Sequence, residues 1–400
     1  MAALPTWNIG EEEETPSKRE PLNAAAGYGK ENVVEELLKE GKPIQLEGQT
    51  RQTPLHEACQ GGHLRVLELL LDHTKDCVNI KDKWERTPVH TSAFHGELEC
   101  LRLLKDKGAN LTASDVNGAQ ASHLAAERNH RNIIEYLYEQ EVILDSADHS
   151  GRLPLHYAAK HGSLNCLVSL VERDCDPTLP DNDGNLPIHI AARYNRLDCL
   201  RFLLETGNRL ESVTPGSSKR RTSLHVSSLC GSEKVVHWLC EKGANVHARD
   251  INGDTPCHLA AQYGRAQCFN CLINHGASVS IKNYKDETPL DVAKRSGHPL
   301  LIAKAIDNNV TCSTCYSNCR LAEWERKHPL PEVHKKIKQA IKKEGLFDIP
   351  VRSAHAEPKS RFYGKFEENL LKKRSPRRDL TAQFLGEHLP TYRPQSSQNF

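Results

Sequence analysis

One pattern of about 33 residues repeats nine times along this chain of 400 residues. Its copies begin at Glu20, Thr53, Thr87, Gln120, Leu153, Leu186, Thr222, Thr255 and Thr288, with gaps of 33, 34, 33, 33, 33, 36, 33 and 33 residues. A unit this short cannot bury its apolar face alone, so each unit must pack against its neighbours. The repetition therefore predicts a stack of similar units rather than two or three separate globular domains.

Each unit is expected to contain two short helices. The pair Thr53-Pro54 predicts the start of the first helix, because a Thr hydroxyl can cap a helix and Pro has no N–H to lose there. Nine residues after every start stands Gly or Asn, the residues that most readily adopt the left-handed conformation that ends a helix. These residues are Gly29, Gly62, Gly96, Asn129, Gly162, Asn195, Gly231, Gly264 and Gly297.

A second, apolar helix and a turn complete the unit. The helical spacing of the apolar residues is exemplified by Leu64, Leu67, Leu70 and Leu71, which predict one buried face. Between units, segments such as Asp115-Val-Asn-Gly118 carry turn residues and predict a projecting β-hairpin.

The segments Thr53-Pro-Leu-His56, Thr87-Pro-Val-His90 and Thr255-Pro-Cys-His258 carry a more specific signal. In a period near 33 residues they resemble the ankyrin repeat family, from about residue 20 to residue 310. The resemblance implies an all-α solenoid of about nine helix-turn-helix units with β-hairpin fingers. It also implies a module that binds other proteins. The sequence has no P-loop, G-x-S-x-G elbow, kinase signature or H-E-x-x-H motif, so neither an enzyme nor a cofactor is expected.

The composition divides the chain into four parts. These are an acidic, disordered N-terminus over 1–19, the array over 20–310, a Cys-containing segment with a basic amphipathic helix over 311–345, and a basic tail punctuated by Pro over 346–400. From Cys319 onward there are 18 Lys and Arg against 10 Asp and Glu, so this extension is expected to contact an acidic surface. No apolar run predicts a signal peptide or a membrane span.

The cysteines and histidines follow the repeat. Cys100, Cys166, Cys199 and Cys268 share one position of the second helix, which favours small buried side chains in a reducing compartment over disulfides. The spacing Cys268-x-x-Cys271 is interpreted as coincidental. Seven units carry His at their fourth position, and these side chains are expected to form hydrogen bonds between units: His56, His90, His123, His156, His189, His225 and His258. At roughly 8–10 Å apart they are too distant to share a metal ion.

No metal site is predicted, although one group of residues was weighed. Three thiols and an imidazole could hold zinc in a tetrahedron, and the candidates are Cys312, Cys315, Cys319 and His328. The group lacks a second matched pair of cysteines, so unligated thiols are the favoured alternative.

Partner binding is assigned to positions that the repeat leaves variable, on the fingers and at the ends of the first helices. Aromatic and Arg side chains dominate binding energy at protein interfaces. The predicted contacts are Trp84, Arg86, Phe94, His95, Arg128, Arg152, Lys160, His161, Arg193, Tyr194 and Tyr263. We expect them to meet an extended or helical segment with acidic side chains; the alternative is that these aromatics only cover the neighbouring unit.

The sequence therefore predicts a non-catalytic adaptor or scaffold, cytoplasmic or nuclear. One alternative is a substrate receptor of a ubiquitin ligase. Another is a nuclear or nucleic-acid-associated regulator that uses the basic cluster Lys372-Lys-Arg-Ser-Pro-Arg-Arg378, in which Ser375 could be phosphorylated. Asn79 occupies the hairpin position that asparaginyl hydroxylases modify in ankyrin proteins and is a second candidate for modification.

Overall fold

A computed structural model describes residues 21–41, 52–73, 77–208 and 219–298. All of them belong to the first of the chain's two units, residues 1–335. The predicted acidic N-terminus, Cys-containing segment, amphipathic helix and basic tail lie outside the described residues, as does the second unit, 336–400.

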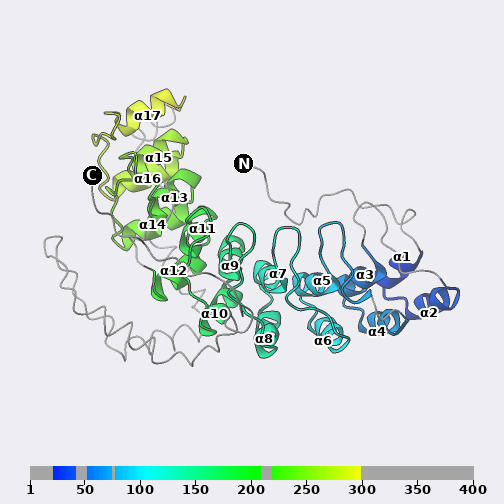
Figure 1. Ribbon diagram of the computed structural model, residues 1–400. Helices are drawn as coiled ribbons and strands as arrows, with labels where there is room; N and C mark the ends of the chain where they lie inside the picture. The colour runs from blue at the N-terminus through cyan, green and yellow to red at the C-terminus, as the bar shows by residue number, and fades with distance from the viewer. Residues whose placement is uncertain (1–20, 42–51, 74–76, 209–218, 299–400) are drawn as a thin grey trace, which may run out of the picture. The chain divides into compact units, whose positions relative to one another are not determined.

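The described residues form helices in pairs, as the repeat predicts (Figure 1). The first helices of the units are α1 (Pro21–Gly27), α3 (Pro54–Gly61), α5 (Pro88–His95), α7 (Ala121–Arg128), α9 (Pro154–His161), α11 (Pro187–Arg193), α13 (Ser223–Cys230), α15 (Pro256–Gln262) and α17 (Pro289–Arg295). The second helices are α2 (Glu31–Lys39), α4 (Leu64–His73), α6 (Leu98–Asp106), α8 (Arg131–Glu139), α10 (Leu164–Glu172), α12 (Leu197–Glu205), α14 (Glu233–Glu241) and α16 (Ala266–Asn274).

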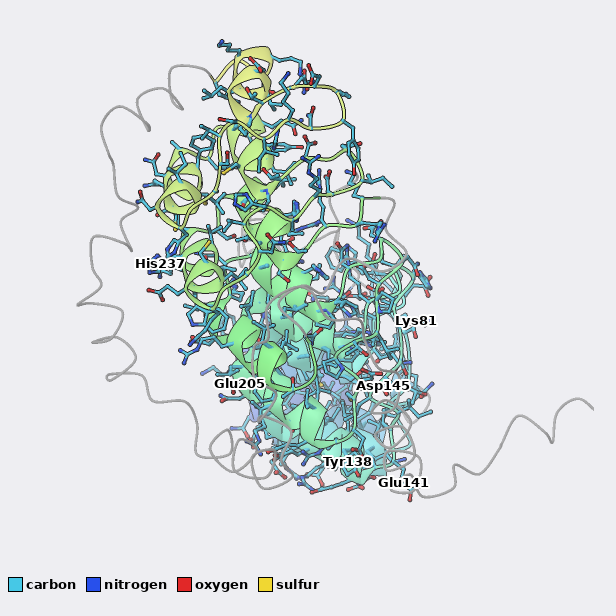
Figure 2. All side chains as sticks on the ribbon, turned by 90° about the vertical axis from the view of Figure 1, so that its left-hand side faces the viewer. Lys81, Tyr138, Glu141, Asp145, Glu205 and His237 are labelled. Atoms are coloured by element: carbon cyan, nitrogen blue, oxygen red, sulfur yellow. The ribbon has the colours of Figure 1, made fainter. Side chains whose placement is uncertain are left out.

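The helices pack in two layers. Each first helix contacts the first helices of the adjacent units, and the second helices pack in the same order behind them. Figure 2 shows Lys81, on a finger, and His237, on α14, on opposite sides of the stack. The fingers and first helices thus form one face of the array, and the second helices form the other.

The second helices supply most of the apolar core. In α4 the buried side chains are Val66, Leu67, Leu70 and Leu71. Each fully buried residue of this kind contributes about 1.5–3 kcal/mol. The prediction for Leu64 was wrong, since its side chain is 42% exposed at the start of the helix and Val66 takes its place in the core. Cys100, Cys166, Cys199 and Cys268 are buried as predicted, and all eleven cysteines of the described segments are free thiols.

The first helices start with a capping box, in which the predicted Thr hydroxyl is joined by the His three residues later. In the units that begin with Thr53, Thr87 and Thr255, the Thr hydroxyl lies 2.9–3.0 Å from Nδ1 of the His three residues later. The same Nδ1 accepts the backbone N–H of the first residue. Units that begin with Gln120, Leu153 or Leu186 keep this second bond without a Thr. The imidazole is therefore the cap common to units with and without Thr. In the units that begin with Thr222 and Thr288, the hydroxyl also accepts the backbone N–H three residues later, as predicted.

The same histidines bond to the residue directly before the next unit starts, whereas bonds across units were predicted. His56 Nε2 lies 3.0 Å from the carbonyl oxygen of Arg86, the residue before the next unit. Equivalent bonds of 3.0–3.2 Å join His90 to Ala119, His123 to Arg152, His156 to Asn185, His225 to Asp254 and His258 to Glu287. Because Nδ1 accepts a backbone N–H, we infer that Nε2 carries the proton and donates to the carbonyl.

A second set of bonds joins the units at the opposite end of the first helices. His130 Nε2 lies 2.9 Å from the carbonyl oxygen of Phe94, and Arg196 Nε donates to the carbonyl of Lys160. The backbone of the helix ends follows the prediction in all nine units, because every Gly or Asn nine residues after a unit's start has φ between 57° and 84°. The first helices are thus fixed at their start to the residue before the next unit, and at their end to the adjacent unit.

The fingers are tight turns closed by aspartate. Asp115 Oδ1 accepts the backbone N–H groups of Asn117 and Ala119, and Asp148 and Asp250 make the corresponding bonds. Val116 N donates to the carbonyl of Trp84, which ties one finger to the next. Within the described segments these fingers contain no regular β-strand, because one or two backbone bonds at each position are too few for a ladder.

Candidate protein-binding surface

A continuous strip of side chains crosses the ends of four first helices, α5, α7, α9 and α11. At each junction, the residue seven positions after one unit's start meets the residue eight positions after the next unit's start. The three pairs are Phe94 with Arg128, Glu127 with His161, and Lys160 with Tyr194. We call these six residues the recognition strip. The structure thus brings together five predicted contacts, and Glu127 completes the series.

Phe94 does not project from the surface as predicted. It is only 4% exposed, because the Arg128 guanidinium lies over its ring at 4.0 Å and His95 packs against its edge. A partner at this position would meet the guanidinium of Arg128, which is exposed. Burial lowers the pKa of His95 to about 4, so its imidazole is neutral near pH 7.

The middle of the strip is partly removed from water. Burial raises the pKa of Glu127, against the opposing effect of Lys160, Arg128 and Arg86. Burial lowers the pKa of Lys160 and also lowers that of His161, to about 4. His161 Nε2 lies 3.7 Å from Glu127, but a neutral imidazole does not neutralise this carboxylate.

The adjoining finger places an aromatic ring and a cation beside the strip. Trp84 is half-buried, with the Arg86 guanidinium 4.7 Å and the Lys83 ammonium 5.3 Å from its ring centre. Arg86 is 5% exposed, and its charge is balanced by Asp82, Asp115 and Glu127. Arg86 therefore links the finger electrostatically to Glu127 of the recognition strip.

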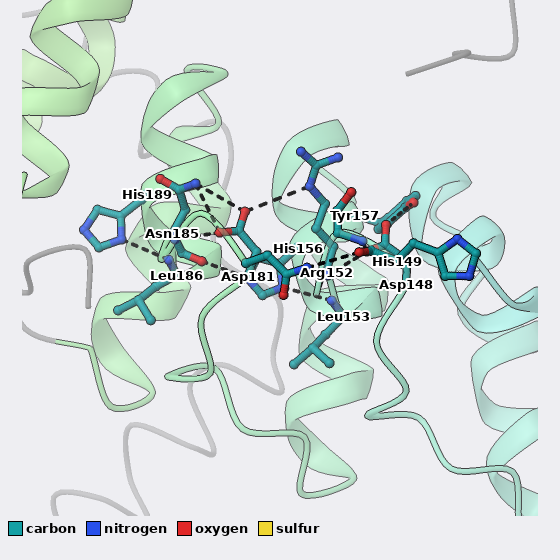
Figure 3. A network of polar contacts seen from close by, with 12 residues as sticks. Asp148, His149, Arg152, Leu153, His156, Tyr157, Asp181, Asn185, Leu186 and His189 are labelled. Atoms are coloured by element: carbon teal, nitrogen blue, oxygen red, sulfur yellow. Dashed lines mark hydrogen bonds and ion pairs between the residues drawn. The ribbon is translucent and has the colours of Figure 1, made fainter. Parts of the chain in front are cut away.

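Arg152 belongs to a polar network between the next two fingers (Figure 3). Its Nε lies 3.9 Å from Asp181, whose side chain is buried. Asp181 also accepts the backbone and side-chain N–H groups of Asn185, while Tyr157 donates its hydroxyl to Asp148 at 2.9 Å. Arg152 therefore orients two fingers, and its half-exposed side chain is only partly available to a partner.

Two further predicted contacts are exposed, and one comparable residue was missed. Arg193 is exposed beside the strip, and Tyr263, 45% exposed, lies at the end of α15, beyond α13. Tyr28 has the same position in its unit as Tyr194 and Tyr263, eight residues after the start, and is 63% exposed. This shared position could have revealed Tyr28 in the sequence.

The covered ring of Phe94 leads to a prediction about stability. Phe94→Ala should lower the free energy of unfolding by about 3–5 kcal/mol, because it leaves a cavity beneath Arg128. Tyr194→Ala should change it by less than about 1 kcal/mol, because the ring is 44% exposed. Urea unfolding of both variants measures the difference; equal stability losses would contradict the assignment of Phe94 to the core.

Of the remaining predicted sites, the structure describes Asn79 alone. Asn79 is exposed, and its Oδ1 accepts the backbone N–H of Asn110 in the next unit at 2.8 Å. Its modification stays a prediction. Ser375 and the zinc candidates Cys312, Cys315, Cys319 and His328 lie outside the described residues.

Comparison with known proteins agrees with this architecture. A family model described as Ankyrin repeats (3 copies) matches residues 22–115, 111–181, 155–250 and 245–312. The chain therefore belongs to the ankyrin repeat family. This fold is a non-enzymatic interaction domain, and ankyrin repeats generally mediate protein–protein interactions.

Individual relatives are more distant. Human Rabankyrin-5 is 32% identical over 72 residues, which cover 18% of this chain and 6% of Rabankyrin-5. Mouse Rabankyrin-5 is 30% identical over 79 residues, 20% of this chain and 7% of its own length. The matches thus span only a small part of these relatives. Among solved structures, the ankyrin repeat domain of human ASB11 is 26% identical with a TM-score of 0.49, and the match covers 55% of this chain and 98% of that one.

Of the helices that the structure describes, none combines the length and the apolar character needed to cross a membrane.

Proposed function

We propose that the array is an adaptor or scaffold that binds a segment of another protein along the recognition strip and the finger that carries Trp84. The observation that carries this proposal is the regular pairing of Phe94 with Arg128, Glu127 with His161, and Lys160 with Tyr194. The pairs hold aromatic and charged side chains in fixed positions on consecutive units. Pre-organised side chains of these types lose little entropy on binding.

The charges favour a partner with acidic side chains. In the recognition strip the two cations, Arg128 and Lys160, outnumber the single carboxylate of Glu127, whereas Arg86 is buried and balanced within the fingers by Asp82 and Asp115. Because burial weakens solvation at Lys160 and Glu127, an acidic group that binds there meets a lower effective dielectric than at an open surface. Tyr194 and Trp84 supply the apolar contacts beside these charges.

The proposal predicts that Trp84→Ala and Tyr194→Ala each weaken binding of the partner by about 2 kcal/mol, which raises Kd roughly 30-fold. The experiment compares the proteins that full-length wild-type and variant chains recover from cells, followed by direct affinity measurement with the recovered partner. Arg128→Glu should weaken binding of the same partner. An acidic-to-basic change in the partner should restore its binding to the Arg128→Glu variant.

Tyr138→Ala is the matched control. Tyr138 is 51% exposed with the Arg173 guanidinium 5.1 Å from its ring, so it resembles Tyr194 but lies on the second-helix layer in α8. Its replacement should leave binding unchanged. Equal effects at Tyr138 and Tyr194, or no effect at Trp84 and Tyr194 in folded variants, would contradict binding by the recognition strip.

A further inference from the structure

A cluster of metal-ligating side chains lies on the second-helix layer, away from the recognition strip. It contains His237 of α14, Cys271 of α16 and His275, which ends α16. Figure 2 labels His237 on the side of the stack opposite Lys81. The seventh unit supplies one of the three residues and the eighth unit supplies two.

The three side chains already converge. Cys271 Sγ lies 3.8 Å from His237 Nδ1, and one ligand atom from each residue lies within 4.8 Å of the others. The two imidazole centres are 5.5 Å apart. Tetrahedral zinc, with bonds of about 2.3 Å to sulfur and about 2.0 Å to nitrogen, separates its ligands by roughly 3.3–3.5 Å. A small inward movement, easiest for the half-exposed His275, would complete this geometry.

The surroundings also fit a metal. Cys271 is fully buried and the side chain of His237 is 2% exposed, which excludes most competing water. Glu241 Oε1 lies 3.0 Å from His237 Nε2, one helical turn along α14. A carboxylate that accepts the proton of the outer nitrogen fixes the tautomer of a ligating histidine. A small rotation of the His237 ring would align this bond to Glu241 and direct Nδ1 at the metal.

The repeat itself does not require these residues. The position of His237 holds Arg201 in the preceding unit and Asn270 in the following one. The positions of Cys271 and His275 hold Trp238 and Lys242 in the seventh unit. The cluster arises where the seventh and eighth units meet, and the spacing of four between Cys271 and His275 places them on one helix face.

We propose that His237, Cys271 and His275 bind a zinc ion that connects α14 to α16. Two imidazoles and one thiolate form a borderline-soft ligand set that suits zinc. Binding removes the proton of the Cys271 thiol, which is released to solvent. The fourth coordination position is taken by water, and Glu241 orients His237 without binding the metal.

The test uses the full-length, reduced chain in which Cys312, Cys315 and Cys319 are replaced by Ser, so that the C-terminal thiols cannot contribute. Cobalt(II) reports geometry through its absorption, and displacement by zinc gives the zinc affinity. We expect one cobalt per chain with tetrahedral and thiolate-to-cobalt bands, release of about one proton, and a higher Tm with zinc. Cys271→Ser and His275→Ala should each lower the zinc affinity at least tenfold, and Glu241→Gln should lower it by about 10–100-fold.

Cys268→Ser is the matched control, because Cys268 is also buried in α16 but lies outside the cluster. It should keep the metal and the thiolate band. His275→Ala, at a half-exposed helix end, preserves the test if Cys271→Ser fails to fold. Absence of zinc uptake, an octahedral cobalt spectrum, or equal affinity in His275→Ala and Cys268→Ser would overturn the proposal.

Discussion

Lowering the pH from 7 to 5 should unfold the array cooperatively. Burial lowers the pKa of His56, His90 and His225 to about 4, whereas the unfolded chain protonates them near 6.5. The unfolded state therefore binds more protons in this interval, so the stabilisation is complete above pH 6.5 and is lost as the pH falls toward 4. At pH 5, compared with pH 7, each of these imidazoles lowers the free energy of unfolding by about 2 kcal/mol. The three together lower it by about 6 kcal/mol, which is comparable to the total stability of many domains.

The structural cause is specific. A proton added at Nδ1 would face the backbone N–H that Nδ1 now accepts, so the cap would be lost on charging. Burial also lowers the pKa of His123, His156 and His258, which adds to the effect. Asp82 and Glu127, whose pKa values burial raises, act in the opposite direction but are fewer.

The first unit supplies the control for this prediction. Asn23 occupies the His position there, and its Nδ2 donates to the carbonyl of Gln52 at 3.2 Å without titrating. His90→Asn should therefore lower proton uptake on unfolding near pH 5 by about one, measured from the pH dependence of urea unfolding. An unchanged proton uptake, or equal stability of the wild type at pH 7 and pH 5, would show that these imidazoles do not control acid unfolding.

Arg221→Ala should destabilise the array by about 3–5 kcal/mol at neutral pH. Arg221 Nε lies 3.2 Å from Asp250 Oδ2, and the side chains are 14% and 0% exposed. Its removal leaves a buried carboxylate whose other oxygen holds the turn of the finger through Asn252 and Asp254. Chemical unfolding with an unchanged m-value measures the loss.

Arg65→Ala is the comparison for Arg221→Ala. Arg65 pairs with Glu68 at 2.6 Å, but both side chains are largely exposed, at 59% and 41%. Such surface pairs contribute about 0–1 kcal/mol. Similar losses in the two variants would mean that the burial of Asp250 does not determine the cost.

The features that sequence could predict are those repeated in every unit. Each of these positions has the same surroundings in every unit. Examples are the Gly or Asn at each helix end, the hydrogen-bonded histidines at the fourth position, and the buried Cys100. The Thr hydroxyl caps its helix as predicted, for example at Thr222. The sequence did not show that the His at the fourth position also accepts the backbone N–H of the first residue, in units with and without Thr.

Side chains that meet across a junction were harder to predict. Phe94 occupies a variable position and was expected to be exposed; Arg128 of the following unit covers it. The exposure of Phe94 depends on the rotamer of Arg128, 34 positions away, and the periodicity of the sequence does not predict a rotamer. The same limit concealed the cluster of His237 with Cys271, since these residues are far apart in the chain and hold different positions in their units.

The hydrogen bonds between units also determine how the array can change in length. At a junction, a His at the start of one first helix donates to the last residue before the next unit, and a side chain after the end of the next first helix donates back to the preceding unit. Each unit thus carries the carbonyl that its own fourth-position His needs, and the donor that a carbonyl of the preceding unit needs. A whole unit could be duplicated or removed with its junctions intact. An insertion of any other length has to leave these bonds in place, and the sequence has one such gap, of 36 residues, before Thr222.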